Sequence, residues 1–387
     1  MDRRAFAGLM IIEMMLAFGN NFAASFNIIY LFEELDMPIW SGPIYLGLGF
    51  GISVLVSLWM SWKPHLDPRN ALIVSLCFLI GEYTLFFFVR DGWILSFAVG
   101  LAFGMYYPLF WTPFNILMAQ MTKKGDRGVT YGAFFFVWPL ATFAAPFLGA
   151  LVIDFASYQM MFAIGIAIII ATALVVFAYR AYIPKDQVMR IRLDAIGKRN
   201  VIALLGEGGF EGVFWADFVI IAWWFVKDEV QLGILFSLFG LSAGIMAIIL
   251  GKVSDKIQNR RFFVQVSALT TIPFVVLISL ASSLEEYAIA NGLLEFCCFM
   301  FPVFLFAIIT DKLEDAKNDS VIGREYLLDI GRVITIAILM VLLYLEVKPQ
   351  VCLLISIPFL LMIALAHEPK REATVLPVGV GHTDQLH

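Results

Sequence analysis

The segment VQLGILFSLFGLSAGIMAIILGKVSDKIQNRR, at residues 230–261, joins a long apolar run to a short loop rich in Lys and Arg. Its apolar part, residues 230–250, has the length of about 20 residues that an α-helix needs to cross the hydrocarbon core of a bilayer. Lys and Arg accumulate in short loops on the cytoplasmic side of membranes. The segment therefore predicts a transmembrane helix that ends in a cytoplasmic turn.

Comparable apolar runs fill most of the chain on both sides of this segment. Hydrophobic residues make up 61% of the 387 residues and charged residues 15%, against about 25% charged in soluble domains. This composition excludes soluble, collagen-like, disordered and disulfide-stabilised proteins, and leaves no length for a separate catalytic domain. Short connections favour antiparallel helices over a barrel. We expect an all-α protein of twelve transmembrane helices, near residues 5–32, 39–62, 70–89, 92–120, 130–153, 156–182, 200–226, 230–250, 262–283, 286–310, 326–346 and 349–367.

One long, basic connection divides these spans into two sets of six. Residues 183–199 carry five Lys and Arg residues and predict a cytoplasmic linker. We therefore expect an N-terminal six-helix bundle over residues 1–182, a C-terminal six-helix bundle over residues 200–367, and a mobile cytoplasmic tail over residues 368–387.

The basic residues are divided unevenly between the two sides of the predicted membrane. Of 26 Lys and Arg residues, 22 fall in the N-terminus, the even-numbered connections or the tail. The odd-numbered connections carry only Arg90, Lys227 and Lys348, and Arg332 lies within a span. The bias of Lys and Arg toward the cytoplasm predicts that both termini are cytoplasmic. We expect a multi-pass protein of the plasma membrane, surrounded by lipids.

Residue types that hold metals or cofactors are sparse. Cys77, Cys297, Cys298 and Cys352 all lie in apolar runs, where cysteine behaves as a small hydrophobe, and their spacing fits neither a disulfide framework nor a zinc site. The chain has no Ser-His-Asp constellation and no phosphate-binding loop. We expect no enzyme activity, no cofactor, no metal and no nucleic-acid partner.

The end of the second span is similar to the end of the eighth. SLWMSWKPHLDPRN at residues 57–70 and AIILGKVSDKIQNRR at residues 247–261 both place an aspartate, Asp67 or Asp255, just past the membrane and follow it with basic residues. Such an internal repeat is typical of two-lobed transporters.

Together, these features resemble the major facilitator superfamily of secondary transporters. The loop signature of that family is a glycine, three residues, an aspartate, a basic residue and then a basic pair. The second-half loop matches it with one residue of extra spacing, through Gly251, Asp255, Lys256, Arg260 and Arg261. The first-half copy departs from it, because Lys63 stands where the glycine would be. Sugar-porter, peptide and nitrate signatures are missing, so the subfamily stays open.

The resemblance implies two pseudo-symmetric lobes around a central cavity, lined by the first, fourth, seventh and tenth spans. It also implies alternating access by rocking of the lobes, and a working monomer. Carried over onto this sequence, the family's loop implies that Gly251 and Asp255, with Arg260 or Arg261, close the cytoplasmic gate.

Ionisable and amide side chains inside the spans are costly, and so mark candidate sites. Glu13, Asn20 and Asn27 recur at intervals of seven in the first span and share one face. The functional reading is a cavity-lining stripe with a protonatable Glu13. The alternative is hydrogen bonding between helices, which polar and small residues also support.

In the seventh span, Glu207 and Glu211 lie one turn apart, and Trp215 continues their face. Two adjacent carboxylates in a low-dielectric site cannot both ionise cheaply, so we expect at least one to bind a proton. Glycines at positions 206, 208, 209 and 212 either permit a bend or allow close helix packing.

Similar spacings occur in three other spans. Tyr107, Trp111 and Asn115 are four residues apart in the fourth span, and so are Asn291 and Glu295 in the tenth. The alternative for the rings is ordinary packing. In the eleventh span, Asp329 and Arg332 are close enough to form an ion pair, which is either structural or part of a gate.

The polar, charged and aromatic residues inside the predicted spans favour a small neutral or cationic, partly apolar cargo. Anion transporters generally need cationic side chains in the cavity, and Arg332 is the only basic residue expected at membrane depth. We expect cargo contacts from Asn20, Asn27, Tyr107, Trp111, Asn115, Trp215 and Asn291, and proton coupling through Glu13, Glu207, Glu211 and Glu295. The alternatives are a lipid or glycolipid transporter on the same fold, or a membrane scaffold or receptor that transports nothing.

Overall fold

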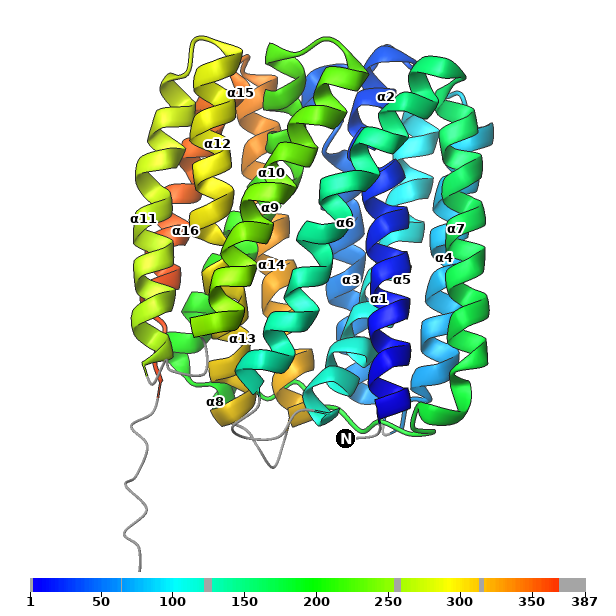
Figure 1. Ribbon diagram of the computed structural model, residues 1–387, viewed down its shortest axis with the longest axis vertical. Helices are drawn as coiled ribbons and strands as arrows, with labels where there is room; N and C mark the ends of the chain where they lie inside the picture. Colours follow the sequence, from blue (N-terminus) through cyan, green and yellow to red (C-terminus); the bar gives the residue numbers. More distant parts are fainter. Residues whose placement is uncertain (1–2, 64, 122–126, 254–258, 313–316, 369–387) are drawn as a thin grey trace, which may run out of the picture.

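The computed structural model describes residues 3–63, 65–121, 127–253, 259–312 and 317–368. Long helices run side by side along one direction and are joined at both ends of the molecule by short connections (Figure 1). Strands are absent from the part of the chain that is described, where the only β-pairing is an isolated bridge between Leu66 and Gln187. The predicted gate residue Asp255 and most of the predicted tail lie outside the described residues.

The first six predicted spans correspond to helices α1 to α7. The first span is broken near its middle, where a short 3-10 turn, η1, joins α1 to α2. The bounds are α1 (Arg3–Ala23), η1 (Ala24–Phe26), α2 (Asn27–Glu33), α3 (Ile44–Trp62), α4 (Pro68–Phe88), α5 (Gly92–Met121), α6 (Arg127–Phe155) and α7 (Tyr158–Ala178).

The second six spans begin with α9, and two of them are also interrupted. The tenth span consists of α12 and α13, and the twelfth of α15, η6 and α16. The bounds are α9 (Lys198–Phe225), α10 (Glu229–Val253), α11 (Arg260–Leu280), α12 (Leu284–Cys298), α13 (Met300–Lys312), α14 (Lys317–Tyr344), α15 (Pro349–Cys352), η6 (Leu353–Ile355) and α16 (Ser356–Ile363). The connections contain η2 (Ile39–Ser41), η3 (Arg180–Tyr182) and α8 (Leu193–Ile196).

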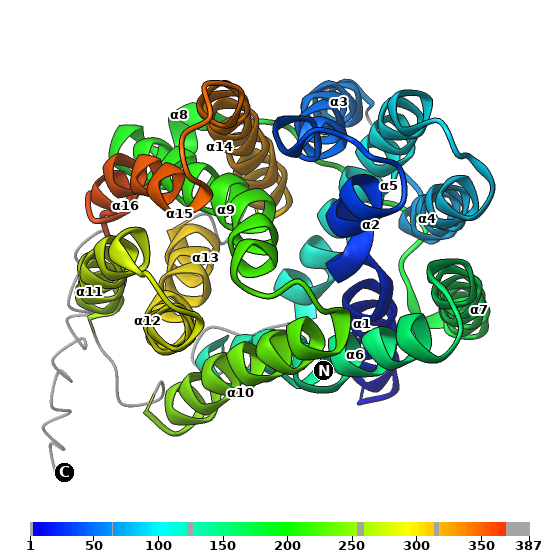
Figure 2. The same ribbon diagram turned by 90° about the horizontal axis from the view of Figure 1, so that it is seen from above.

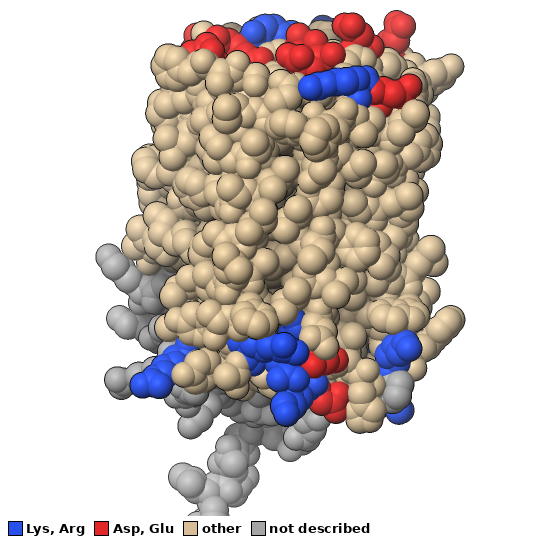
Figure 3. All heavy atoms as spheres, turned by 90° about the vertical axis from the view of Figure 1, so that its right-hand side faces the viewer, with Lys and Arg blue, Asp and Glu red and all other residues tan. Residues whose placement is uncertain are grey.

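The outer surface of this helical assembly is apolar over its middle. Ten segments of the described chain are long and apolar enough to cross a membrane. A broad uncharged belt separates two charged ends in the space-filling view, with Lys and Arg gathered at the lower end and Asp and Glu prominent at the upper (Figure 3). Large side chains such as Leu55, Phe88 and Leu174 are exposed, as expected for a surface that faces lipid. The protein is a multi-pass integral membrane protein.

The helices form two groups that meet along two pairs of helices. Seen from above, α1 to α7 lie on one side and most of α9 to α16 on the other (Figure 2). Helix α6 packs against α10, and α3 packs against α14, so these pairs join the groups.

Within the second group, α9 packs closely against α14 and α16. A Cβ atom added at Gly208 would overlap the backbone of Leu328 on α14, and one added at Gly331 would overlap the carbonyl of Leu205 on α9. Helix α9 is continuous from Lys198 to Phe225. In this structure its glycines therefore serve close packing and not a bend.

The eleventh span begins earlier than the apolar run predicts. Its helix, α14, starts at Lys317, whereas the sequence predicts a start at residue 326. Arg324, assigned to a cytoplasmic connection from the sequence, is instead buried in the helix and only 6% exposed. The prediction was wrong because the charge of Arg324 is balanced by carboxylates, among them Glu207, which lies 117 residues away in the sequence.

At the end of the molecule where α1 begins, the linker between the groups contacts both of them. Its residue Gln187 pairs with Leu66 before α4, and the Asn318 side chain of α14 donates a hydrogen bond of 2.7 Å to the Val188 carbonyl. Asp67 caps α4 by accepting from the backbone N–H of Arg69. Hydrogen bonds from the Arg69 side chain hold the pKa of the Asp67 carboxyl below its ordinary value.

Candidate functional site

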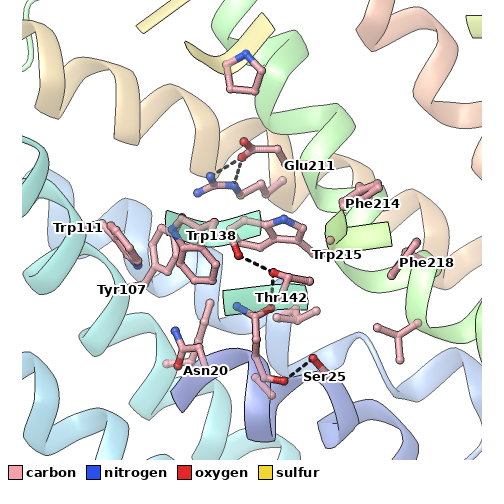
Figure 4. Close-up of a pocket in the computed structure, with 18 of the residues that line it drawn as sticks. Asn20, Ser25, Tyr107, Trp111, Trp138, Thr142, Glu211, Phe214, Trp215 and Phe218 are labelled. Atoms are coloured by element: carbon pink, nitrogen blue, oxygen red, sulfur yellow. Dashed lines mark hydrogen bonds and ion pairs between the residues drawn. The ribbon is translucent and has the colours of Figure 1, made fainter. Parts of the chain in front are cut away.

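A cavity of about 520 Å³ lies between the two groups of helices. Its wall is drawn from both groups, with residues of the first, fourth, seventh and tenth spans among them. Rings dominate its middle, where Tyr107 packs against Trp215 and Trp111. In the close-up, the polar side chain of Glu211 lies above these rings and that of Asn20 lies below them (Figure 4). The cavity can therefore hold a small molecule with both apolar and polar parts.

Most of the predicted site residues line this cavity. Those that do are Glu13, Asn20, Asn27, Tyr107, Trp111, Asn115, Glu211, Trp215, Glu295 and Arg332. Three others, Glu207, Asn291 and Asp329, are buried but lie away from the cavity wall.

The predicted gate residues do not form one group with the cavity. Gly251 lies near the end of α10, and Asp255 falls outside the described residues. Arg260 at the start of α11 forms an ion pair with Asp311 on α13, and the backbone N–H of Arg261 donates to Glu368. These contacts lie within the second group of helices.

Arg332 on α14 is the centre of a buried ion-pair network. Its Nε atom lies 2.9 Å from an Oε2 atom of Glu211 on α9, and its Nη1 atom lies 2.6 Å from an Oδ1 atom of Asp329. Arg332 is 2% exposed, so its positive charge is balanced by the protein and not by water. The hydroxyl of Ser53 on α3 donates to the other oxygen of Asp329, which connects the network to the first group of helices.

A second arginine on the same helix continues the network. The guanidinium of Arg324 lies 2.5 Å from a carboxylate oxygen of Glu207 and 2.7 Å from one of Glu325. Arg324 and Glu325 both line the cavity, and neither is among the predicted site residues. The signal for Glu325 was its spacing with Asp329 and Arg332 at i, i+4 and i+7, which marks one face of a helix, whereas Arg324 had no such signal.

The network holds more acidic than basic groups. Four carboxylates contact two guanidinium groups among the described residues of α9 and α14, through Arg324, Arg332, Glu207, Glu211, Glu325 and Asp329. Ionised groups in an interior of low dielectric are costly unless paired, so a surplus of negative charge favours the binding of protons.

Three rings surround the guanidinium of Arg332. Its central carbon lies 4.7 Å from the ring centre of Trp215, 5.0 Å from that of Phe50 and 5.1 Å from that of Tyr107. These are distances at which the face of an aromatic ring attracts a cation. Because Phe50 and Tyr107 belong to the first group of helices and Arg332 to the second, the guanidinium joins the two groups across the cavity.

Direct hydrogen bonds cross between the groups at both ends of the cavity. Toward the end where α1 begins, the side chain of Asn115 on α5 donates to Glu325 on α14 over 3.2 Å, and Gln120 donates to Asn318 over 2.9 Å. At the opposite end, the indole N–H of Trp223 on α9 donates to Glu33 on α2 over 2.8 Å.

The first-group wall of the cavity carries an amide and tyrosine network. Asn20 accepts a hydrogen bond of 3.1 Å from the hydroxyl of Tyr83 and donates one of 3.2 Å to the hydroxyl of Tyr106. Asn27 is buried, and Glu13 is buried with one carboxylate oxygen unpartnered. Unpartnered polar groups at a cavity wall are available to a ligand.

The comparisons with known proteins identify the fold. No family model and no curated protein sequence matches the chain. Several solved structures match it over nearly its whole length. The human organic anion transporter MFSD10 (TETRAN) is 15% identical, with a TM-score of 0.67 over 94% of this chain and 99% of its own.

Two further solved structures match a similar share of the chain. The fucose:proton symporter FucP of E. coli, a major facilitator superfamily transporter, is 14% identical, with a TM-score of 0.66 over 94% of this chain and 97% of its own. The POT family transporter PepTSo is 10% identical, with a TM-score of 0.71 over 94% of this chain and 96% of its own. The protein therefore has the major facilitator superfamily fold, as the sequence predicts.

Proposed function

We propose that the protein is a secondary transporter that moves a small neutral or cationic, partly apolar solute across the membrane by alternating access, coupled to protons. One observation carries the proposal. A buried network with four carboxylates and two guanidinium groups lies at the wall of a cavity of about 520 Å³ between the two groups of helices.

Proton coupling follows from the charge surplus of this network. Glu211 lines the cavity and is paired with Arg332, whereas Glu207 lies behind the wall and is paired with Arg324. A proton on Glu211 weakens its pull on Arg332, which leaves the guanidinium to Asp329 and to the rings around it. Glu13 and Glu295 line the same cavity and are the further candidates for proton binding.

The charge of the cavity wall supports the choice of cargo. The sequence predicts a single arginine at membrane depth, but the structure adds Arg324. Each of the two guanidinium groups is bonded to two carboxylates, so neither is left to attract an anion. Within the described lining, neither Glu13 nor Glu295 forms an ion pair with a basic side chain. The wall therefore favours a neutral or cationic cargo with an apolar part.

The structural neighbours and the charge pattern support the rest of the proposal. FucP is a proton symporter of fucose, which supports proton coupling on this fold, whereas MFSD10 is an organic anion transporter and differs from the cargo proposed here. Lys and Arg gather at the end of the molecule where α1 begins (Figure 3). By the bias of basic residues toward the cytoplasm, we place both termini there, in a plasma-membrane monomer with six-helix lobes at residues 1–182 and 200–367.

The test is proton-driven flux in proteoliposomes. A thermal-stability screen of the purified protein against amines, sugars, metabolites, drugs and lipids first identifies a cargo, because a ligand that binds only the folded state stabilises it. With that cargo, an imposed pH gradient is expected to drive flux in the wild type and not in Glu211→Gln. The matched control is Glu285→Gln, which removes an exposed carboxylate at the surface of α12.

Two outcomes would contradict the proposal. Flux that is driven equally well in Glu211→Gln and in the wild type would show that Glu211 does not couple protons to cargo. A screen in which only lipids raise the melting temperature would favour the lipid transporter.

A further inference from the structure

We propose that Glu82 on α4 forms a cation subsite in the first-group wall of the cavity, which binds the ammonium group of an amine cargo. The inference deepens the proposed function, because it takes the cavity to be the cargo site. It concerns a residue that the proton-coupling network does not use.

The Glu82 side chain is both buried and available. It is 2% exposed, it lines the cavity, and its Oε2 atom has no hydrogen-bond partner. The described part of the chain places no basic side chain in an ion pair with it. A buried, ionised carboxylate that lacks a partner carries a large free-energy cost. A cation or a proton that reaches it through the cavity removes most of that cost and therefore binds favourably.

Three tyrosines line the cavity together with this carboxylate. They are Tyr45, Tyr83 and Tyr106. The hydroxyls of Tyr83 and Tyr106 are already bonded to Asn20, which holds the two side chains in position. Aromatic rings attract an ammonium group, so tyrosines that share a cavity with a carboxylate can contribute to a cation site.

The basic groups of the cavity lie on the other wall. Arg324 and Arg332 both belong to α14 and are each bonded to two carboxylates, whereas Glu82 belongs to α4. The rings of Trp111, Trp138 and Trp215 also line the cavity and can hold the apolar part of the same molecule. The geometry therefore fits an amine with a ring-bearing or aliphatic body.

Another unpartnered carboxylate shows why position in the cavity matters. Asp217 on α9 is fully buried and both of its oxygens lack a hydrogen-bond partner, but it does not line the cavity. It is therefore the matched control for Glu82, since it tests the removal of a buried, unpartnered carboxylate away from the proposed subsite.

The test compares three probes with the same apolar body and different charge. 4-Phenylbutylamine, 4-phenylbutan-1-ol and 4-phenylbutyrate are titrated into the full-length protein in detergent, with tryptophan fluorescence as the readout. We expect the amine to bind the wild type roughly tenfold more tightly than the alcohol, the size of one ion pair at a partly desolvated site. Glu82→Gln is expected to remove this preference and leave the affinity for the alcohol unchanged.

Two further variants make the result specific to Glu82. Asp217→Asn is expected to keep the preference for the amine. Glu82→Asp keeps the charge on a shorter side chain, so it is expected to retain part of the preference, and it replaces Glu82→Gln if that variant does not fold.

Several outcomes would overturn the subsite. They are equal affinities of the wild type for amine and alcohol, an unchanged preference in both Glu82 variants, and loss of the preference in Asp217→Asn as well. Binding needs no transport, so the result is separate from the test of the proposed function. Glu82-dependent binding of the amine without proton-driven flux would support the subsite and contradict the transporter.

Discussion

The guanidinium of Arg332 on α14 lies 4.7 Å from the centre of the Trp215 ring on α9. Trp215 follows Glu211 by one helical turn, and Glu211 is ion-paired with the same guanidinium. One face of α9 therefore presents both a negative charge and an aromatic ring to Arg332. If the two groups of helices separate, Phe50 and Tyr107 leave the guanidinium, whereas Trp215 and Glu211 stay with it.

Replacing the ring of Trp215 tests this arrangement. Trp215→Leu is expected to lower stability by about 0.5–2 kcal/mol beyond the loss of packing, because the cation–π contact is lost, and Trp215→Phe is expected to retain part of it. The measurement is the unfolding of the purified variants in detergent. Trp224→Leu is the control, since Trp224 is on the same helix and 45% exposed. Equal losses in Trp215→Leu and Trp224→Leu would contradict an attraction between Arg332 and the ring.

Removing the charge of Arg332 is expected to make stability depend on pH. Arg332→Gln leaves Glu211 and Asp329 without their cation, and breaking a buried pair from one side costs about 3–5 kcal/mol. Protonation neutralises the two carboxylates, so the folded variant binds more protons than the unfolded chain, and its stability rises as the pH falls. The difference in melting temperature from the wild type should therefore be larger at pH 7.5 than at pH 5.5.

A double variant is the control for that pH dependence. Arg332→Gln combined with Glu211→Gln removes one of the two orphaned carboxylates, and is expected to recover part of the lost stability and of the pH dependence. A double variant less stable than Arg332→Gln at pH 7.5 would show that the orphaned carboxylate is not the cause.

The order and number of the spans could be predicted from the sequence, but one boundary could not. Apolar runs report the cost of placing a side chain in hydrocarbon, and this cost decides where helices lie. The apolar runs do not show where a residue far away in the sequence balances a buried charge. Arg324 therefore looked like a loop residue, because nothing near it in the sequence shows that Glu207 on another helix balances its charge.

Polar spacing predicted which side chains share a helix face, but not where each face points. Asn20 and Asn27 share a face that lines the cavity, as do Glu211 and Trp215. Asn291 has the same kind of spacing with Glu295, yet only Glu295 lines the cavity. The direction of a face depends on the packing of neighbouring helices, which sequence spacing does not contain.

The crossing of α9 and α14 gives a prediction about glycine. A Cβ atom at Gly208 would overlap the backbone of Leu328, which cannot move aside as a side chain can. Gly208→Ala is therefore expected to cost about 1–3 kcal/mol of stability through overpacking. Gly292→Ala is the control, because no atom lies within 4 Å of its added Cβ, and it is expected to gain about 0.5–1 kcal/mol from helix propensity. Similar melting temperatures for the two variants would contradict close packing at Gly208.

The end of the cavity opposite the start of α1 is closed by contacts between the two groups of helices. Trp223 on α9 donates to Glu33 on α2, and the hydroxyl of Tyr158 on α7 donates to Glu229 on α10 over 3.0 Å. Opening this end requires both hydrogen bonds to break, so Trp223→Phe together with Tyr158→Phe is expected to favour the conformation that is open there.

Labelling of a single cysteine measures that shift. Ser25→Cys, in a variant whose four native cysteines are replaced by serine, places a thiol on the cavity wall. We expect the paired Trp223 and Tyr158 changes to raise the rate of reaction with a membrane-impermeant maleimide several-fold in intact cells, because each lost hydrogen bond is worth about 1 kcal/mol. Gln120→Ala removes a bond at the other end of the cavity, so it is the matched control and should not raise the rate. A faster reaction in Gln120→Ala than in the paired variant would mean that the Trp223 end faces the cytoplasm.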